Sequence, residues 1–178
     1  RISSLIDRMA AIAKHLRNFA RKPNEKLASV PVATVINDAL EILNQRVKTV
    51  EAEVSVDLPN NEWWVVGGQV RLQQVLVNLI SNALDSIEAA ETKKIEISAE
   101  KTDETVIIRV RDFGPGIEPE AVGQIFDPFF TTKEEGMGIG LSISTSIVEE
   151  HGGGSEESWV GKGCWDLLLW DDQLKKNA

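Results

Sequence analysis

The chain has 178 residues, of which 42% are hydrophobic and 26% charged, and its formal net charge is −9. This size and composition suit one compact globular domain with an appendage, and the acidic balance excludes a general nucleic-acid binder, which would carry a basic face. A single cysteine, Cys164, excludes an internal disulfide framework, and the sequence has no run of about 18 apolar residues to cross a membrane.

The first 21 residues carry one apolar stripe at steps of three and four residues, which predicts a helix of coiled-coil type. Because so short a helix is marginal in water, we interpret it as half of a dimerising helical hairpin. The alternative is a helix that packs on its own domain. Residues 22–34 are predicted to be a linker. Since the chain starts inside a helical pattern, we expect it to be part of a longer protein.

From residue 35 onward the hydrophobic pattern predicts helices that alternate with strands. Helices are expected at 35–48, 70–87 and 139–150, and strands near 54–56, 63–66, 95–100 and 106–110. A loop is expected at 123–138, a last hairpin up to about residue 170, and a polar tail at 171–178. This mixture indicates an α/β (α+β) two-layer sandwich over residues 35–170.

The helix expected at 70–87 carries Asn78 and Asn82, whose four-residue step puts both side chains on one face. Among apolar neighbours, two such polar groups are costly unless something satisfies them. A carboxamide oxygen suits Mg²⁺, which usually keeps several waters and bridges phosphates. The alternative is a pair of buried asparagines that bond to the backbone. Asp85 and Ser86, one turn further, are candidates to line the same pocket.

A second motif, Asp112-Phe113-Gly114-Pro115-Gly116, follows an apolar strand. A carboxylate there can accept a hydrogen bond from the exocyclic amine of adenine, and it would repel a base with a carbonyl at that position. The glycines let the backbone approach the purine closely. The alternative is an ordinary Pro-Gly turn after a strand.

The stretch from Phe126 to Lys133 combines three aromatic residues with Thr131, Thr132 and Lys133. Two hydroxyls and a cation suit a phosphate-binding loop, although a solvated surface cation is the alternative for Lys133.

A glycine-rich segment then opens the last predicted helix. Free N–H groups and the helix dipole favour anions at such a helix start. A flexible turn is the alternative. The residues concerned are Gly136, Gly138, Gly140 and Leu141.

Together these four motifs, over about a third of the chain, resemble the N, G1, F and G2 boxes of the sensor histidine kinase catalytic domain. That domain belongs to the superfamily of gyrase B, the heat-shock chaperone ATPases, histidine kinases and MutL. The resemblance implies a Bergerat-type fold, in which helices cover one face of a mixed sheet, preceded by the second helix of a dimerisation hairpin at 1–21. The short spacing after Phe130 is similar to the dicarboxylate-sensing and nitrogen-regulation branch.

The resemblance also implies ATP and Mg²⁺ as ligands and assigns roles to the residues. Asn82 holds the metal, Asp112 contacts adenine, and Asn78 and Lys133 are catalytic. Asn78 stands where ATPases and serine kinases have a glutamate base, and an amide cannot accept a proton, so Asn78 favours phosphorylation of histidine. The further nucleotide contacts fall to Gly114, Gly116, Thr131, Thr132, Lys133, Gly136, Gly138, Gly140 and Leu141.

The resemblance therefore implies the cytoplasmic ATP-binding domain of a two-component protein-histidine kinase. The complete protein would be a homodimer in the bacterial inner membrane that moves the γ-phosphoryl of Mg-ATP to a hairpin histidine and then to a response regulator. Neither His15 nor His151 is followed by the acidic residue expected of a phosphoacceptor, so we expect this chain to bind ATP without phosphorylating itself. His151 stands at a predicted helix end, where a cation would favour the dipole.

Two alternatives stay open. One is a serine kinase or ATPase of the same superfamily. The other is a non-catalytic nucleotide-binding or dimerisation module, which the unusual last strand favours, because Asp166 stands where a buried aromatic residue is expected. A one-residue shift that buries Trp165, Leu167 and Leu169 would repair that strand; otherwise Trp170 is exposed.

Overall fold

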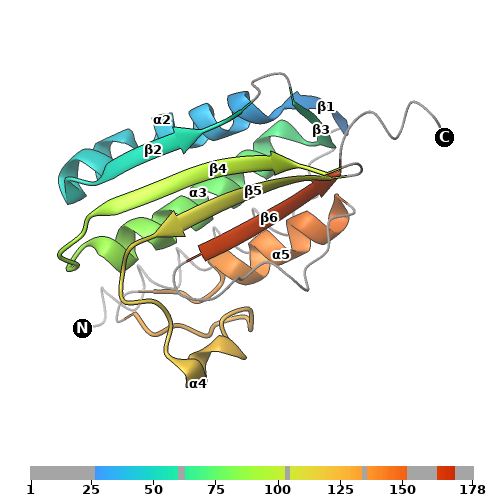
Figure 1. Cartoon of the computed structure of the whole chain (residues 1–178). Helices are drawn as coiled ribbons and strands as arrows, with labels where there is room; N and C mark the ends of the chain where they lie inside the picture. Colours follow the sequence, from blue (N-terminus) through green and yellow to red (C-terminus); the bar gives the residue numbers. More distant parts are fainter. Residues whose placement is uncertain (1–26, 60–62, 103–104, 134–135, 152–163, 171–178) are drawn as a thin grey trace, which may run out of the picture.

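The computed structural model describes residues 27–59, 63–102, 105–133, 136–151 and 164–170. The helix predicted for residues 1–21 and the tail at 171–178 lie outside the described residues. None of the described helices has the length and apolar character that a membrane crossing needs. The elements, drawn in Figure 1, are β1 (Ala28–Pro31), α2 (Val32–Val50), β2 (Glu53–Asp57), β3 (Trp64–Gly67), α3 (Gln69–Ile87), β4 (Lys94–Lys101), β5 (Thr105–Asp112), α4 (Pro119–Val122), α5 (Gly140–Glu150) and β6 (Cys164–Trp170).

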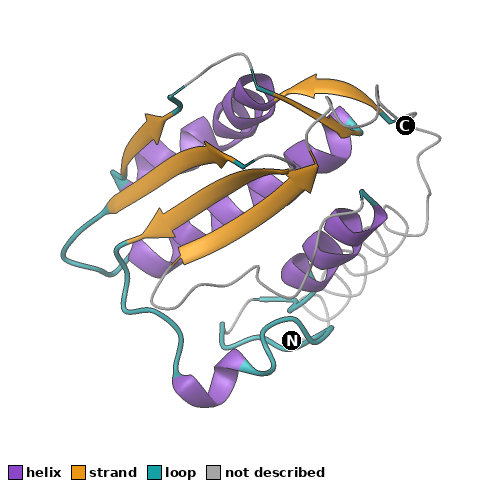
Figure 2. Ribbon diagram, turned by 45° about the vertical axis from the view of Figure 1, so that its right-hand side comes forward, coloured by secondary structure: helices purple, strands orange, loops and turns teal. Residues whose placement is uncertain are grey.

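The main sheet has four strands in the order β2-β4-β5-β6. β2 runs parallel to β4, whereas β4 and β5, and β5 and β6, are antiparallel. Figures 1 and 2 show α2, α3 and α5 on one face of this sheet. The predicted two-layer α/β sandwich with a mixed sheet is therefore confirmed.

The core lies between the sheet and these helices. α3 contributes a stripe of apolar side chains that recurs every three or four residues, and Leu72, Leu76 and Ile80 are all fully buried. They face alternate residues of the sheet, such as Ile95 and Ile108, which are also fully buried. Each such side chain stabilises the fold by about 1.5–3 kcal/mol, so the burial of one face of α3 fixes where its polar face points.

A small second sheet was not expected. β1 pairs with β3 in antiparallel fashion, and the Val32 N–H donates to the Trp63 carbonyl at 3.0 Å. β1 lies inside the 22–34 segment that the sequence suggested as a linker, and α2 begins at Val32 rather than residue 35. Residues 28–31 therefore belong to the folded domain and not to a linker. Short α4 also forms just before the predicted 123–138 loop.

β6 completes the sheet despite its unusual sequence. Its backbone register pairs Leu167 with Ile108 and Trp165 with Val110. Ile108 and Val110 are buried residues of β5. This register agrees with the one-residue shift that the sequence offered as a repair of the strand.

His151 connects the ends of two helices. Its Nδ1 lies 2.6 Å from the Ile147 carbonyl of α5, and its Nε2 accepts a hydrogen bond from the Gly68 N–H at 2.9 Å, just before α3 begins. A ring that donates through Nδ1 and accepts through Nε2 is neutral. The sequence suggested a cationic His151 at this helix end, whereas these two hydrogen bonds are those of a neutral ring.

Candidate functional site

The polar face of α3 carries the first of the four motifs and contacts the other three. Asn78, Asn82 and Ser86 follow one another at four-residue steps, so their side chains share one face of the helix. Asn78 contacts Gly140 of the glycine-rich segment, Asn82 contacts Lys133, and Ser86 contacts Asp112. Segments far apart in the sequence therefore meet along one line on α3.

Asn78 ties α3 to the first turn of α5. Its Nδ2 donates to the Gly140 carbonyl at 3.1 Å and to the Ser144 hydroxyl at 3.2 Å. Ser144 is buried, and its hydroxyl also donates to the Gly140 carbonyl at 3.0 Å. Asn78 thus makes the backbone contact that was the alternative for this residue, and this contact holds the start of α5 against α3.

Asp112 ends β5 as a buried carboxylate that is only 5% exposed. Its Oδ1 accepts hydrogen bonds from the Ser86 hydroxyl and from the Gly114 N–H, both at 2.9 Å. Burial raises the pKa of Asp112, and these two hydrogen bonds counteract part of that rise because they favour the carboxylate. Both bonds use Oδ1, which leaves Oδ2 as the oxygen for a ligand contact.

Two glycines shape the turn after Asp112. A Cβ on Gly114 would lie 2.1 Å from the Ser86 hydroxyl and 2.8 Å from the Ser86 carbonyl oxygen, so only glycine lets this turn approach α3. Gly116 has a φ of 82°, in the left-handed region that favours glycine. The Phe113 ring lies 4.8 Å from the Arg111 guanidinium and 5.3 Å from the Lys94 ammonium, a cation–π arrangement at the strand end.

The loop between α4 and α5 folds back on itself. The Phe129 N–H donates to the Gly138 carbonyl at 2.8 Å, and Gly138 has a φ of 65°. A Cβ on Gly138 would lie 2.4 Å from the Phe130 carbonyl oxygen, and one on Gly136 would lie 2.3 Å from the Thr131 hydroxyl. Gly138 is therefore required by close approach to the loop backbone, whereas a Cβ on Gly136 would meet side chains alone.

Lys133, in this loop, contacts α3. Its ammonium donates to Asn82 Oδ1 at 3.0 Å and forms an ion pair with Asp85. The other Asp85 oxygen pairs with Arg46 of α2, and Arg46 also donates to the Ser81 hydroxyl at 2.6 Å. Partial burial, and to a lesser degree the Arg46 guanidinium, lowers the pKa of Lys133.

The remaining predicted residues differ in how they are placed. The Thr131 hydroxyl accepts a hydrogen bond from the Lys133 N–H at 3.1 Å, whereas the Thr132 side chain is exposed. Leu141 is half-buried and packs against the core.

Four further polar residues take part in these contacts. Asp85 and Ser86, three and four residues after Asn82, were candidates from helical spacing, and they contact Lys133 and Asp112. Arg46 and Ser144 lie on α2 and α5, where no motif marks them.

The oxygen atoms at this position fit a metal ion that is coordinated partly by the protein and partly by a bound ligand. Within the described ranges, no group of three or more His, Cys, Asp or Glu side chains could hold a metal ion. However, the Asn82 and Asp85 oxygens already attract the Lys133 ammonium. Mg²⁺ keeps several waters and takes phosphate oxygens, so one carboxamide oxygen at this position suits a magnesium nucleotide better than a bare metal.

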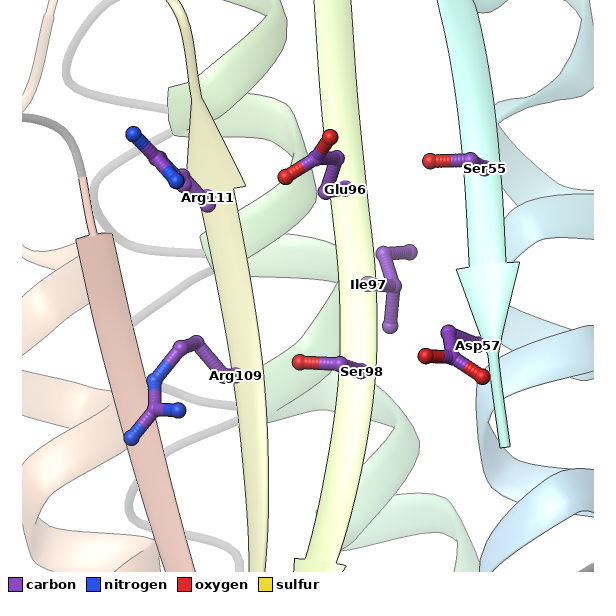
Figure 3. Close-up of a pocket in the computed structure, with 7 residues that line it drawn as sticks. All are labelled: Ser55, Asp57, Glu96, Ile97, Ser98, Arg109 and Arg111. Atoms are coloured by element: carbon purple, nitrogen blue, oxygen red, sulfur yellow. The ribbon is translucent and has the colours of Figure 1, made fainter. Parts of the chain in front are cut away.

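A shallow hollow lies elsewhere, on the sheet face that the helices leave open, and contains none of the predicted site residues (Figure 3). Two of its charged residues are paired, since Lys94 donates to Glu96 at 2.7 Å and Arg109 lies 3.6 Å from Glu100. The hollow is lined by Ser55, Asp57, Glu96, Ile97, Ser98, Arg109 and Arg111.

The sequence of this chain is similar to a known family and to curated proteins. Residues 67–168 match the family model described as histidine kinase-, DNA gyrase B-, and HSP90-like ATPase. The C4-dicarboxylate transport sensor protein DctB of Rhizobium meliloti (strain 1021) is 37% identical over 152 residues, which cover 85% of this chain and 24% of DctB. The chain thus spans about a quarter of the length of that curated relative.

Solved structures show the same similarity. The nucleotide-free catalytic domain of the histidine kinase ThkA has a TM-score of 0.71 at 28% identity, covering 82% of this chain and 97% of that one. ThkA in complex with the response regulator protein TrrA has a TM-score of 0.75 at 25% identity, covering 98% of this chain and 50% of that one.

Proposed function

Because this chain belongs to the histidine kinase-, DNA gyrase B- and HSP90-like ATPase family, we propose that it binds Mg-ATP along the polar face of α3 and presents the γ-phosphoryl group to a histidine. The chain is the ATP-binding catalytic domain of a sensor histidine kinase. The residue roles, the metal and the partners given below are our proposals.

A single observation carries the proposal. Three residues on one face of α3 reach Asp112, Lys133 and Gly140, the three groups that would meet the base, the charged end and the phosphates of a nucleotide. An elongated ligand with a base at one end and a polyphosphate at the other matches this linear arrangement.

The adenine end of the site is built around Asp112. Oδ1 is held by Ser86 and Gly114, so Oδ2 would accept the exocyclic amine of adenine. A guanine base would place a carbonyl oxygen against this carboxylate, and that repulsion would select adenine nucleotides. Gly114 and Gly116 keep the turn thin enough for the base to approach.

The phosphate end lies at the start of α5. Backbone N–H groups at Gly136, Gly138, Gly140 and Leu141 would bind phosphate oxygens, with the α5 dipole favouring their charge. Asn78 would keep this start of the helix in place. Thr131, Thr132 and Lys133 would contribute from the loop. Asn82 would hold Mg²⁺, which when bound would neutralise phosphate charge.

Phosphoryl transfer at such a site depends mainly on positioning and on neutralised charge. Asn78 cannot act as a base, which suits a histidine acceptor, since the neutral imidazole is already a nucleophile. In the complete protein, the acceptor would lie on a dimerisation hairpin that makes it a homodimer, and a response regulator would take the phosphoryl group from the resulting phosphoprotein. The ThkA–TrrA complex supports such a partner. We also propose that the complete protein resides in a bacterial inner membrane.

Calorimetric titration of Mg-ATP tests the proposal. The parent chain should bind saturably, and Asp112→Ala should weaken binding at least about 100-fold, because the buried adenine contact is lost. Asp57→Ala is the matched control, since Asp57 also ends a strand but is exposed on β2. Its affinity should equal that of the parent. A parent chain that does not bind would favour the non-catalytic dimerisation module.

A further inference from the structure

Lys133 places a cation at the proposed metal ligand. The Lys133 ammonium lies 3.0 Å from Asn82 Oδ1 and also pairs with Asp85. Lys133 belongs to the loop between α4 and α5, whereas Asn82 and Asp85 lie one turn apart on α3. This contact therefore ties the loop to the helix at the point where the metal would bind.

An ammonium and a divalent metal cannot use this oxygen together. A metal would lie about 2.1 Å from Asn82 Oδ1, and an ammonium hydrogen-bonded to the same oxygen would be close to it. Two cations so near each other repel strongly in a partly buried site. Occupation of Asn82 by Lys133 and by a magnesium nucleotide should therefore exclude each other.

Asp85 is the residue that holds Lys133 in this position. Its carboxylate is three-quarters buried, with 24% of the side chain exposed, and it lies between Lys133 and Arg46. Arg46 is in turn bound to the Ser81 hydroxyl at 2.6 Å. Arg46 of α2 pairs with this carboxylate and is itself bound to Ser81 of α3, so Lys133 is the partner of Asp85 that comes from a loop rather than from a helix.

We propose that Asp85 is a positioning residue that keeps the Lys133 ammonium on Asn82 in the nucleotide-free protein, and that Lys133 leaves Asn82 when a magnesium nucleotide binds. This inference rests on the proposed function of Asn82. A contact present only in the free protein reduces the apparent affinity for the ligand, because the ligand must break it. The contact thus keeps Lys133 on α3 until the nucleotide arrives.

A double-mutant cycle on Mg-ADP affinity tests the exchange. The four proteins are the parent, Asp85→Asn, Lys133→Met and the double variant. Asp85→Asn alone also removes a charge near the metal, but its effect in the Lys133→Met background reports that contribution separately. The change in Mg-ADP affinity that Asp85→Asn causes in the parent is compared with the change that it causes in Lys133→Met. The change in the parent should be more favourable to binding by about threefold to fivefold, the range expected for one partly exposed ion pair. No coupling, or coupling of opposite sign, would overturn the proposal.

A second measurement needs no nucleotide. The rate of acylation of Lys133 in the free protein, followed by mass spectrometry, should rise severalfold in Asp85→Asn because the amine is released. Asp85→Glu should restore the slow rate, since it keeps the charge. Glu88→Gln is the matched control, because Glu88 is exposed at the end of the same helix and should leave the rate unchanged.

The two measurements separate the two proposals. If Mg-ADP fails to bind the parent chain while Asp85→Asn still releases Lys133, the proposed function fails and the contact stands. If Mg-ADP binds and Lys133 is equally reactive in all variants, the positioning role of Asp85 is wrong.

Discussion

At the scale of single residues, Asp112 shows a conflict between function and stability. The side chain is almost completely buried, and its burial raises its pKa, which means that the folded state disfavours the carboxylate. Ser86 and Gly114 offset only part of this cost through their hydrogen bonds to Oδ1. A charge held in this way suits a binding residue, because its remaining oxygen can be satisfied by the ligand.

This conflict predicts that Asp112→Asn loses nucleotide binding while unfolding at a higher urea concentration than the parent at pH 7. In the parent, the folded state binds more protons than the unfolded state between the ordinary aspartate pKa of about 3.9 and the raised folded-state pKa. The stability of the parent therefore falls as pH rises through this window. Above the window, the full cost of burying the ionised Asp112 carboxylate is present. Urea unfolding at several pH values measures the difference.

The higher stability of Asp112→Asn over the parent should disappear as the pH falls through the same window, because the parental carboxyl is then protonated. The exposed Asp57→Asn variant is the control, and its curves should follow those of the parent. An Asp112→Asn protein that is less stable than the parent at pH 7 would show that the hydrogen bonds outweigh the cost of burial.

At the scale of elements, His151 joins α5 to α3. The N–H of Gly68 precedes the first turn of α3, where donors have no partner within the helix, and His151 Nε2 accepts from it. Through Nδ1 the same ring is held by the Ile147 carbonyl of α5. The two helices that carry Asn82 and the glycine-rich segment are therefore connected at a second point, besides Asn78.

His151→Ala should lower the free energy of unfolding by about 1–3 kcal/mol, because it leaves the buried Gly68 N–H without its acceptor. Chemical denaturation measures this loss. Glu149→Ala on the same helix end, where the side chain is exposed, should change stability by no more than about 0.5 kcal/mol. Equal effects of the two substitutions would mean that the ring contributes nothing through its hydrogen bonds.

At the scale of the whole molecule, we propose that the ATP-binding domain depends on another element for its phosphoacceptor. The sequence places Leu16 after His15, whereas an acidic residue is expected after a phosphoacceptor. The structure uses both ring nitrogens of His151 to connect helices.

We therefore expect no acid-labile label on this chain after incubation with γ-labelled ATP, under conditions where calorimetry detects binding. A label that is lost in His15→Gln would identify His15 as the acceptor and would contradict this expectation. His151→Gln serves as the parallel variant, and it should leave any labelling unchanged.

The sequence alone determined most of the elements and the family, and it supplied the prediction for the site. Apolar periodicity located α2, α3 and α5 and the strands of the sheet to within a few residues, because burial of one face leaves a direct trace in the pattern. The four-residue step from Asn78 to Asn82 placed both side chains on one face of α3. The four motifs together pointed to a nucleotide and to its family.

The tertiary structure alone decided which distant side chains complete the site. Arg46 bonds to Ser81 across 35 residues, and Gly68 bonds to His151 across 83 residues. The parallel pairing of β2 with β4 and the strand β1 were likewise not marked in the pattern. Periodicity records whether a face is buried but not which face of another element covers it, so contacts of this kind arise only when the chain is folded.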